Sequence, residues 1–342
     1  MTQFVTLKRS LLLGVITLVC WQQAFAAVPE LKGTIKIDGS STVYPITEAV
    51  TEDFQKTFKE VNVTVGISGT GGGFKKFAAG EIDIADASRP IKQAEIEACQ
   101  ANKIEYVELP IAYDALSVVV NPKNTWVTSL TIKELAKIWS PDAQGKIMKW
   151  SDVRPGWPET PIALFGPGTD SGTFDYFTEA VVGKQGSSRG DYTSSEDDNV
   201  LVQGVAGTQG ALGFFGVSYY EGNKDKLKIV PIDDEKAENG AGPMLPTQEN
   251  VLKGAYSPLS RPLFVYARKD ALDRPEVKEF VAFYIKNVPA LATEVGYIKL
   301  PEKVYALTTE RFSKKVIGTL FGGAGSQVGM TLEDLLKKEQ GS

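Results

Sequence analysis

The chain has 342 residues, contains no histidine, and carries 37 basic and 42 acidic side chains, a formal net charge of −5. The absence of histidine excludes Ser-His-Asp and Cys-His catalysis, histidine general bases and most zinc sites. The negative charge argues against binding to nucleic acid or to anionic membranes. A small buried anion site remains compatible with it, because surface charge is screened over about 10 Å at 0.1 M salt.

Residues 1–26 have the pattern of a secretory signal peptide. The basic pair Lys8-Arg9 precedes an apolar run from Leu11 to Cys20, and Ala24-Phe25-Ala26 forms an A-x-A cleavage site. The apolar run is too short to cross a bilayer. We therefore expect cleavage after Ala26 and a periplasmic protein without stable membrane insertion. The one remaining cysteine, Cys99, allows no internal disulfide.

Three strand–loop–helix units are predicted near the start of the mature chain. Residues 33–38, 61–67 and 81–85 carry the pattern of strands. The loops that follow them are Gly39-Ser40-Ser41-Thr42-Val43-Tyr44-Pro45, Ser68-Gly69-Thr70-Gly71-Gly72-Gly73 and Asp86-Ala87-Ser88-Arg89-Pro90. Helices are expected from Pro45, around Phe74 and over 92–99. This alternation favours a parallel α/β sheet, in which ligands lie beyond the C-terminal ends of the strands.

These loops have the composition of an oxyanion site. Free N–H groups and the positive dipole end at a helix N-terminus hold an anion without any cation, and glycines let the backbone approach closely. Arg89 adds a planar fork of donors, and Asp86 has the chemistry to accept the proton of a protonated oxyanion. The alternative interpretations are structural: a Ser or Thr helix cap, and a surface Arg–Asp pair.

The middle of the chain is expected to enter a second domain. Strands of the buried type, 107–111 and 116–120, are separated by Ala112-Tyr113-Asp114, where we place the crossing. About 316 residues after cleavage favour two domains. Thr131-Ile132-Lys133-Glu134 is a capping box that predicts a helix start. The tryptophans expected in the core are Trp139, Trp150 and Trp157.

The second domain repeats the strand–loop–helix unit. A strand over 162–165 leads into Gly166-Pro167-Gly168-Thr169, and apolar residues from Phe174 to Val181 recur at helical spacing. This spacing places Ser171, Gly172 and Thr173 in the first turn. Asp170-Ser171-Gly172 looks like the nucleophile of a serine hydrolase, but the chain lacks the histidine partner. The alternative is a helix cap with a structural role only.

The remaining elements are predicted more coarsely. Arg189 lies in a polar loop, 186–191, from which it could reach a cleft. Ser195-Glu196-Asp197-Asp198 is expected to cap a helix, and a strand near 260–266 to carry the chain back to the first domain. Further expected elements are strands over 213–217 and 227–231, helices over 276–285 and 289–294, and a frayed tail from Glu333.

The four loop motifs in this order resemble those of the periplasmic phosphate-binding proteins of the Pst ABC transporter, the PstS family, and are closest to its SphX-like branch. The resemblance covers essentially the whole mature chain. It implies a type II, two-lobed periplasmic binding fold, each lobe a mixed, mostly parallel sheet flanked by helices, with phosphate in the cleft between the lobes. The implied lobes are 27–112 with 262–342, and 113–261.

The same resemblance implies a set of phosphate ligands. They are Ser41, Thr42, Val43, Thr70, Gly71, Ser171, Gly172 and Thr173, and we expect Ser88 of the third loop to be a further ligand. Two positions depart from the family pattern: Pro167 stands where well-known members have an arginine, and Ser88 where they have an aspartate. We expect Arg89 to replace the cation and Asp86 the acceptor carboxylate. The next candidates for these two roles are Arg189 and Asp170.

The expected function is binding without chemistry, with no catalytic residue, cofactor or metal. A monomer would bind inorganic phosphate and deliver it to an inner-membrane ABC permease. An acceptor carboxylate would favour protonated phosphate over sulfate, because sulfate brings no proton at neutral pH. The alternatives are a binding protein for sulfate or molybdate, an exported phosphatase or related hydrolase that uses the same loops, and an adhesion or matrix protein.

Overall fold

A computed structural model describes residues 31–322, apart from 170, 196 and 239, together with residue 332. The expected signal peptide, Asp170 and the tail from Glu333 lie outside the described residues. In the described part of the chain, no helix is both long and apolar enough to span a membrane.

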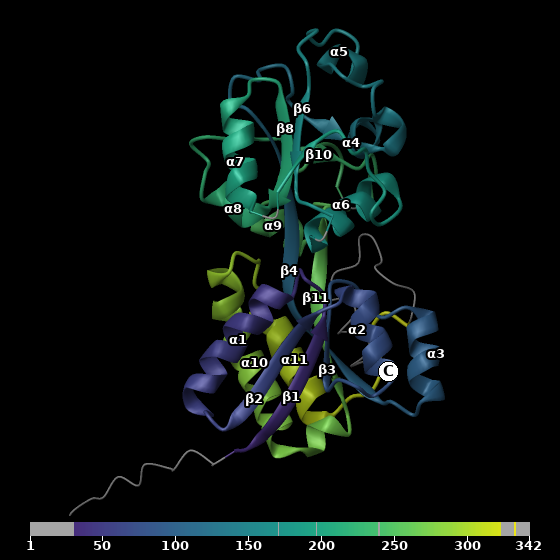
Figure 1. The fold of residues 1–342 in the computed structure, drawn as a ribbon, viewed down its shortest axis with the longest axis vertical. Coiled ribbons are helices and arrows are strands. Elements are labelled where there is room, and N and C mark those ends of the chain that lie inside the picture. The colour runs from purple at the N-terminus through teal and green to yellow at the C-terminus, as the bar shows by residue number, and fades with distance from the viewer. Residues whose placement is uncertain (1–30, 170, 196, 239, 323–331, 333–342) are drawn as a thin grey trace, which may run out of the picture. The chain divides into compact units, whose positions relative to one another are not determined.

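The strands form one large mixed sheet and one small sheet (Figure 1). The large sheet has the order β2-β1-β3-β11-β4-β8-β6-β7, with β9 also paired to β4, and the small one joins β10 to β5. In the large sheet, the outer strand pairs are parallel, whereas β11 and β4 pair antiparallel with each other and with their neighbours. The bounds are β1 Gly33–Gly39, β2 Val61–Ile67, β3 Ile84–Ala87, β4 Tyr106–Val120, β5 Leu130–Thr131, β6 Ala163–Gly166, β7 Thr193–Ser194, β8 Ala211–Gly216, β9 Lys228–Ile229, β10 Ile232–Asp233 and β11 Ser260–Arg268.

Helices flank the strands, with α1 and α10 on one side of β1–β3 and α2 and α3 on the other (Figure 1). Their bounds are α1 Tyr44–Thr57, α2 Gly69–Ala78, α3 Gln93–Ala101, α4 Ile132–Trp139, α5 Trp150–Val153, α6 Gly172–Val182, α7 Asp198–Gly207, α8 Val217–Glu221, α9 Gln248–Leu252, α10 Pro275–Glu294 and α11 Glu302–Lys314. Two short 3-10 turns, η1 Pro141–Ala143 and η2 Ala271–Asp273, complete the elements.

Several local predictions are confirmed. The strands over 33–38 and 61–67 match β1 and β2. The capping box opens α4: Glu134 N–H donates to Thr131 Oγ1 over 3.1 Å, and Thr131 N–H donates to the Glu134 carboxylate over 2.9 Å. Trp139 and Trp150 are buried, and Trp157 is half-buried beneath the guanidinium of Arg154.

The strand predictions are wrong at two places. The two strands expected on either side of residues 112–114 are a single buried strand, β4. The segment stays extended because it pairs with β11 along 106–115 and with β8 along 116–120. The strand predicted over 81–85 is observed at Ile84–Ala87.

The helix predictions are also wrong at two places. The helices expected over 276–285 and 289–294 are one helix, α10, with Pro289 inside it, because buried residues from Val277 to Ala292 hold both parts against the core. The glycine run after β2 is not a loop, since α2 already begins at Gly69. Gly73 packs so closely that an added Cβ would lie 2.6 Å from the Gly39 Cα.

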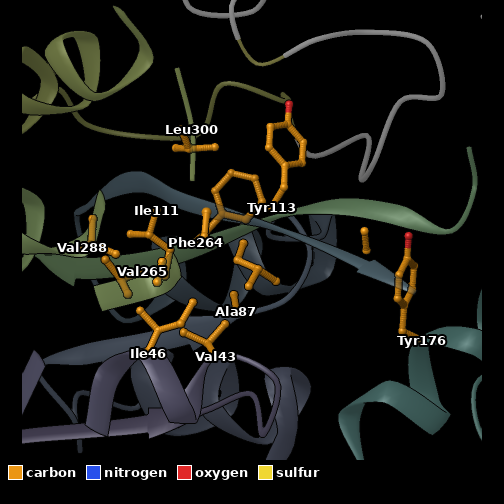
Figure 2. Close-up of a cluster of buried hydrophobic side chains, with 14 of the residues drawn as sticks. Val43, Ile46, Ala87, Ile111, Tyr113, Tyr176, Phe264, Val265, Val288 and Leu300 are labelled. Atoms are coloured by element: carbon orange, nitrogen blue, oxygen red, sulfur yellow. The ribbon is translucent and has the colours of Figure 1, made fainter. Parts of the chain in front are cut away.

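The apolar residues of α1, α10 and the central strands meet in one core. Figure 2 shows Val43 and Ile46 directed towards Val265 and Val288, with Ile111 close by. Because Val43 and Ile46 are buried at the start of α1, the core holds the first predicted loop in place.

Candidate functional site

The first three motif loops lie together at the C-terminal ends of β1, β2 and β3. Ser40 N–H donates to the Asp86 carbonyl over 2.9 Å, which joins the first loop to the third. Ser68 N–H donates to the Gly39 carbonyl over 3.2 Å, which joins the second loop to the first. The Tyr297 hydroxyl, which the sequence did not single out, donates to the Thr42 carbonyl over 2.6 Å. The N-termini of α1 and α2 therefore open at the same edge of the sheet.

The fourth motif meets the first directly, although about 130 residues separate them. Gly172, the first residue of α6, lies so close to the first loop that an added Cβ would be 2.3 Å from Thr42 Oγ1 and 2.5 Å from Ser41 Oγ. Only a glycine fits this contact without displacement. Three helix N-termini, those of α1, α2 and α6, thus carry the motif residues that the sequence assigned to an anion site.

Two hydroxyl groups of these motifs accept backbone N–H groups. Ser171 Oγ accepts the N–H of Thr173 over 3.1 Å, and Thr70 Oγ1 accepts the N–H of Ser88 over 3.2 Å. Thr70 also lies 3.0 Å from Ser88 Oγ. A hydroxyl that accepts an internal N–H keeps its own proton to donate. Such groups suit an anion, which accepts hydrogen bonds and donates few.

Some backbone N–H groups of the first loop form hydrogen bonds within the loop itself. Thr42 N–H donates to Ser40 Oγ and Val43 N–H to the Ser40 carbonyl, each over 3.2 Å. Ser41 N–H has no hydrogen-bond partner within the described residues. Ser41 is also half-buried, whereas Val43 is completely buried. Of this loop, Ser41 and the Thr42 hydroxyl are the groups best placed for a ligand.

Arg261 supplies a buried cation at the site, and the sequence analysis did not single it out. Its Nη2 donates to Thr42 Oγ1 over 3.0 Å and to the Gly172 carbonyl over 3.3 Å, so it contacts both the first and the fourth motif. Its Nε donates to Asp114 over 3.4 Å, and its guanidinium lies 3.7 Å from the ring centre of Tyr176. Nη1 makes no hydrogen bond to any described residue.

The partner of Arg261 is a buried carboxylate on the neighbouring strand. Asp114 on β4 lies opposite Arg261 on β11 in the antiparallel register. Burial raises the pKa of Asp114, and the guanidinium opposes this rise. The sequence did contain a signal for this pair. The two segments predicted to cross between the domains, 112–114 and 260–266, each carry one charged residue, Asp114 and Arg261, and these have opposite charges.

Arg89, the predicted cation, is engaged elsewhere. Its guanidinium donates twice to Glu95, over 2.9 and 2.7 Å, and once to the Pro90 carbonyl over 3.1 Å. It also lies over the ring of Phe74. Arg89 stands near the start of α2, 3.9 Å from where a Cβ of Gly71 would be. Its charge is neutralised by Glu95, so Arg261 is the better candidate for the cation.

Arg189, the second candidate cation, has no donor left for a ligand. Its Nε and Nη2 donate to the Asp191 carboxylate, over 2.5 and 2.8 Å, and Nη2 also approaches the sulfur of Met148. Nη1 donates to the carbonyls of Ile138 and Ile147. Arg189 is buried within this set of contacts. The expectation that it reaches a cleft is therefore corrected: it ties its loop to the end of α4.

Asp86, the predicted acceptor, is enclosed within the protein. Both carboxylate oxygens are inaccessible to solvent and have no hydrogen-bond partner within the described residues. Burial raises the pKa of Asp86 to about 8, so the side chain is mainly protonated at neutral pH. Its backbone supports the first loop, but the carboxyl group does not open onto the motif residues. The expectation that Asp86 receives the proton of the ligand is corrected accordingly.

The described residues contain no group of three or more Cys, Asp or Glu side chains placed to hold a metal ion. The arrangement is instead one cation, several hydroxyl donors and three helix N-termini, which is suited to hold a small oxyanion.

Comparison with known proteins identifies the family of this chain. A family model described as a PBP superfamily domain matches residues 26–288. The SphX protein of Synechocystis sp. is 53% identical over 307 residues, which cover 90% of each chain. The chain belongs to the family of PstS and SphX.

The family resemblance extends to more distant relatives and to a solved structure. The phosphate-binding protein PstS of Staphylococcus saprophyticus is 40% identical over 286 residues, 83% of this chain and 84% of the relative. The crystal structure of a possible phosphate-binding protein from Planctomyces limnophilus has a TM-score of 0.77 at 51% identity, and covers 84% of this chain and 99% of that one. The fold is the type II periplasmic binding fold of this family.

Proposed function

We propose that this protein binds inorganic phosphate. One observation carries the proposal: the buried guanidinium of Arg261 joins the first and the fourth motif, and its Nη1 makes no hydrogen bond to any described residue. The Thr42 hydroxyl accepts from this cation, and Ser171 directly precedes Gly172, whose carbonyl also accepts from it. Phosphate-binding proteins among the relatives support phosphate as the oxyanion.

The lobes of the proposed binding protein meet where β4 and β11 cross. We place the lobe boundaries at 112/113 and 261/262, next to Asp114 and Arg261. Arg261 then contacts Thr42 of the first lobe and Gly172 of the second, and its full set of contacts exists only when the lobes are closed. Closure would also remove the ligand from water, which strengthens every charged hydrogen bond in the site.

The proposed setting is the periplasm. Residues 1–26 would direct export, with cleavage after Ala26, and the mature monomer would deliver phosphate to an inner-membrane ABC permease. The protein would act as a binding protein without catalysis, cofactor or metal. The PstS and SphX relatives support this setting, because their similarity to this chain extends over 83% and 90% of its length, respectively.

Selectivity against sulfate requires an acceptor in the site. Since Asp86 is enclosed, we assign this role to Asp114, the carboxylate next to Arg261. A raised pKa makes Asp114 a better proton acceptor than an ordinary surface carboxylate. Asp114→Asn is then expected to bring the affinities for phosphate and sulfate closer together, because the amide can donate to sulfate.

Titration calorimetry of the mature protein tests the proposed function. Phosphate is expected to bind with one-to-one stoichiometry, and a large excess of sulfate is expected not to displace it. Tighter binding of sulfate or molybdate than of phosphate would contradict the proposal. A chromogenic phosphate ester, offered with and without divalent metal ions, is expected to show no turnover; metal-dependent turnover would instead favour an exported phosphatase.

A further inference from the structure

Tyr176 on α6 is buried at the candidate site, where it contacts Arg261. The neighbouring Phe174 and Phe177 stack on Tyr192 and Phe214. Tyr176 makes none of the ring–ring contacts recorded among the described residues, and its ring lies 3.7 Å from Arg261 Cζ. Figure 2 shows Tyr176 on α6 apart from the aliphatic cluster of α1 and α10.

The ring and the hydroxyl of Tyr176 contact the same segment of chain. The hydroxyl donates to the Pro258 carbonyl over 2.5 Å, just before β11 begins, and the ring covers the guanidinium that β11 carries. Tyr176 also follows Gly172 by four residues, so both lie on one face of α6. That face therefore meets Arg261 at two points, the Gly172 carbonyl and the Tyr176 ring.

These contacts restrict the guanidinium in complementary directions. The Tyr176 ring covers one flat face of the group, and Asp114 accepts from its Nε edge. The Nη edge is left to point between Thr42 and Gly172. A long arginine side chain has many rotamers, so a binding site gains when they are already restricted before the ligand arrives.

We propose that Tyr176 is a positioning residue that orients Arg261 towards the anion and makes this orientation depend on the docking of α6. The inference rests on the proposed function, because it deepens the role of the same site. Tyr176 itself does not touch the anion. It acts through Arg261, so its effect on affinity disappears when Arg261 is replaced.

A double-mutant cycle with phosphate calorimetry tests this dependence. Tyr176→Phe keeps the ring and is expected to bind within about threefold of the wild type. Tyr176→Leu removes the ring and is expected to weaken phosphate binding about five- to thirtyfold. In the Arg261→Met background, Tyr176→Leu is expected to have almost no further effect, because the group that it positions is gone.

Tyr192→Leu is the matched control for packing. Tyr192 stacks on Phe174 of α6 and meets Trp139 edge to face, so its loss is expected to lower the melting temperature without the change in phosphate affinity seen for Tyr176→Leu. Equal affinity losses for Tyr176→Leu with and without Arg261 would overturn the inference, as would wild-type affinity in Tyr176→Leu. If the wild type bound sulfate rather than phosphate, the proposed function would fail, and the same cycle measured with sulfate would still decide the role of Tyr176.

Discussion

Arg261 is the residue on which the proposed anion site depends most. It is the one described cation that contacts both the first and the fourth motif, and it pairs with a carboxylate that is itself buried. The two arginines that the sequence favoured form ion pairs elsewhere, Arg89 with Glu95 and Arg189 with Asp191. The charge of the site therefore comes from the strand crossing and not from a motif loop.

We expect Arg261→Met to weaken phosphate binding about 100-fold, because charge-assisted hydrogen bonds contribute roughly 1.5–3 kcal/mol each. Arg261→Lys should recover only part of this loss, because one ammonium cannot reproduce the fork of donors. Calorimetry measures both. Arg89→Met is the matched control and should bind nearly as the wild type. A larger loss of phosphate affinity for Arg89→Met than for Arg261→Met would show that Arg89 supplies the cation of the site.

Replacing Arg261 leaves Asp114 buried without its partner, which alone can lower stability. The double variant Arg261→Met/Asp114→Asn removes this unpaired buried charge. If the double variant folds but binds phosphate much more weakly than Asp114→Asn alone, the role of Arg261 in binding is separated from its role in stability.

The raised pKa of Asp86 predicts that the stability of the protein depends on pH. Its ordinary pKa is 3.8, and burial raises the folded-state pKa to about 8. The folded protein therefore keeps a proton that the unfolded chain releases, and the stabilisation that this proton gives is complete below pH 3.8 and lost as the pH rises to about 8. Above that pH the contribution no longer changes.

Asp86→Asn should therefore be more stable than the wild type by a margin that grows between pH 5 and 8. Each pKa unit corresponds to about 1.4 kcal/mol, so we expect the margin to increase by roughly 2 kcal/mol or more over this range. Urea denaturation at pH 5, 6.5 and 8 measures it. A margin that stays constant with pH would show that Asp86 does not titrate in this window.

At the scale of elements, α6 couples the motif to the strand crossing. Ser171 caps the helix, Gly172 contacts the first loop, and Tyr176 covers Arg261. The start of α6 therefore carries a capping hydroxyl and a close backbone approach, and Tyr176, one turn further along, covers the guanidinium.

Gly172→Ala tests the close approach. The new Cβ would overlap Thr42 Oγ1, which Arg261 holds in place, so α6 could not reach its observed position. We expect phosphate affinity to fall about ten- to hundredfold, while the melting temperature of the ligand-free protein changes little. Gly207→Ala, at the end of α7, is the matched control because nothing lies within 4 Å of its Cβ position. An unchanged affinity for Gly172→Ala would argue against closure onto the first loop.

At the scale of the whole molecule, ligand binding and stability are linked. If phosphate binds only the folded, closed protein, a concentration of 1,000 Kd adds about 4.1 kcal/mol to the free energy of unfolding. Thermal melts should therefore rise with phosphate and with arsenate, and stay unchanged with equimolar sulfate. A shift produced equally by all three anions would indicate general salt effects instead of a specific site.

Local sequence patterns were sufficient to predict where the helices of the proposed site begin. Glycines, hydroxyl residues and apolar spacing specify helix starts at short range, and the starts near Pro45, Thr131 and Phe174 are found close to where these patterns place them. The order of the four motifs was also sufficient to indicate the family, because it depends on chain order alone.

The choice of charged groups at the proposed site depends on tertiary contacts. Arg189 and Arg261 look alike in sequence, each within a polar or strand-like segment, but one is saturated by carbonyls and Asp191 while the other faces two motifs. The pairing of β4 with β11 places Arg261 beside Asp114 and Thr42, across about 150 and 220 residues of chain. Such contacts depend on strand register and helix docking, which no local pattern encodes, because the free energy that selects them comes from burying the whole core.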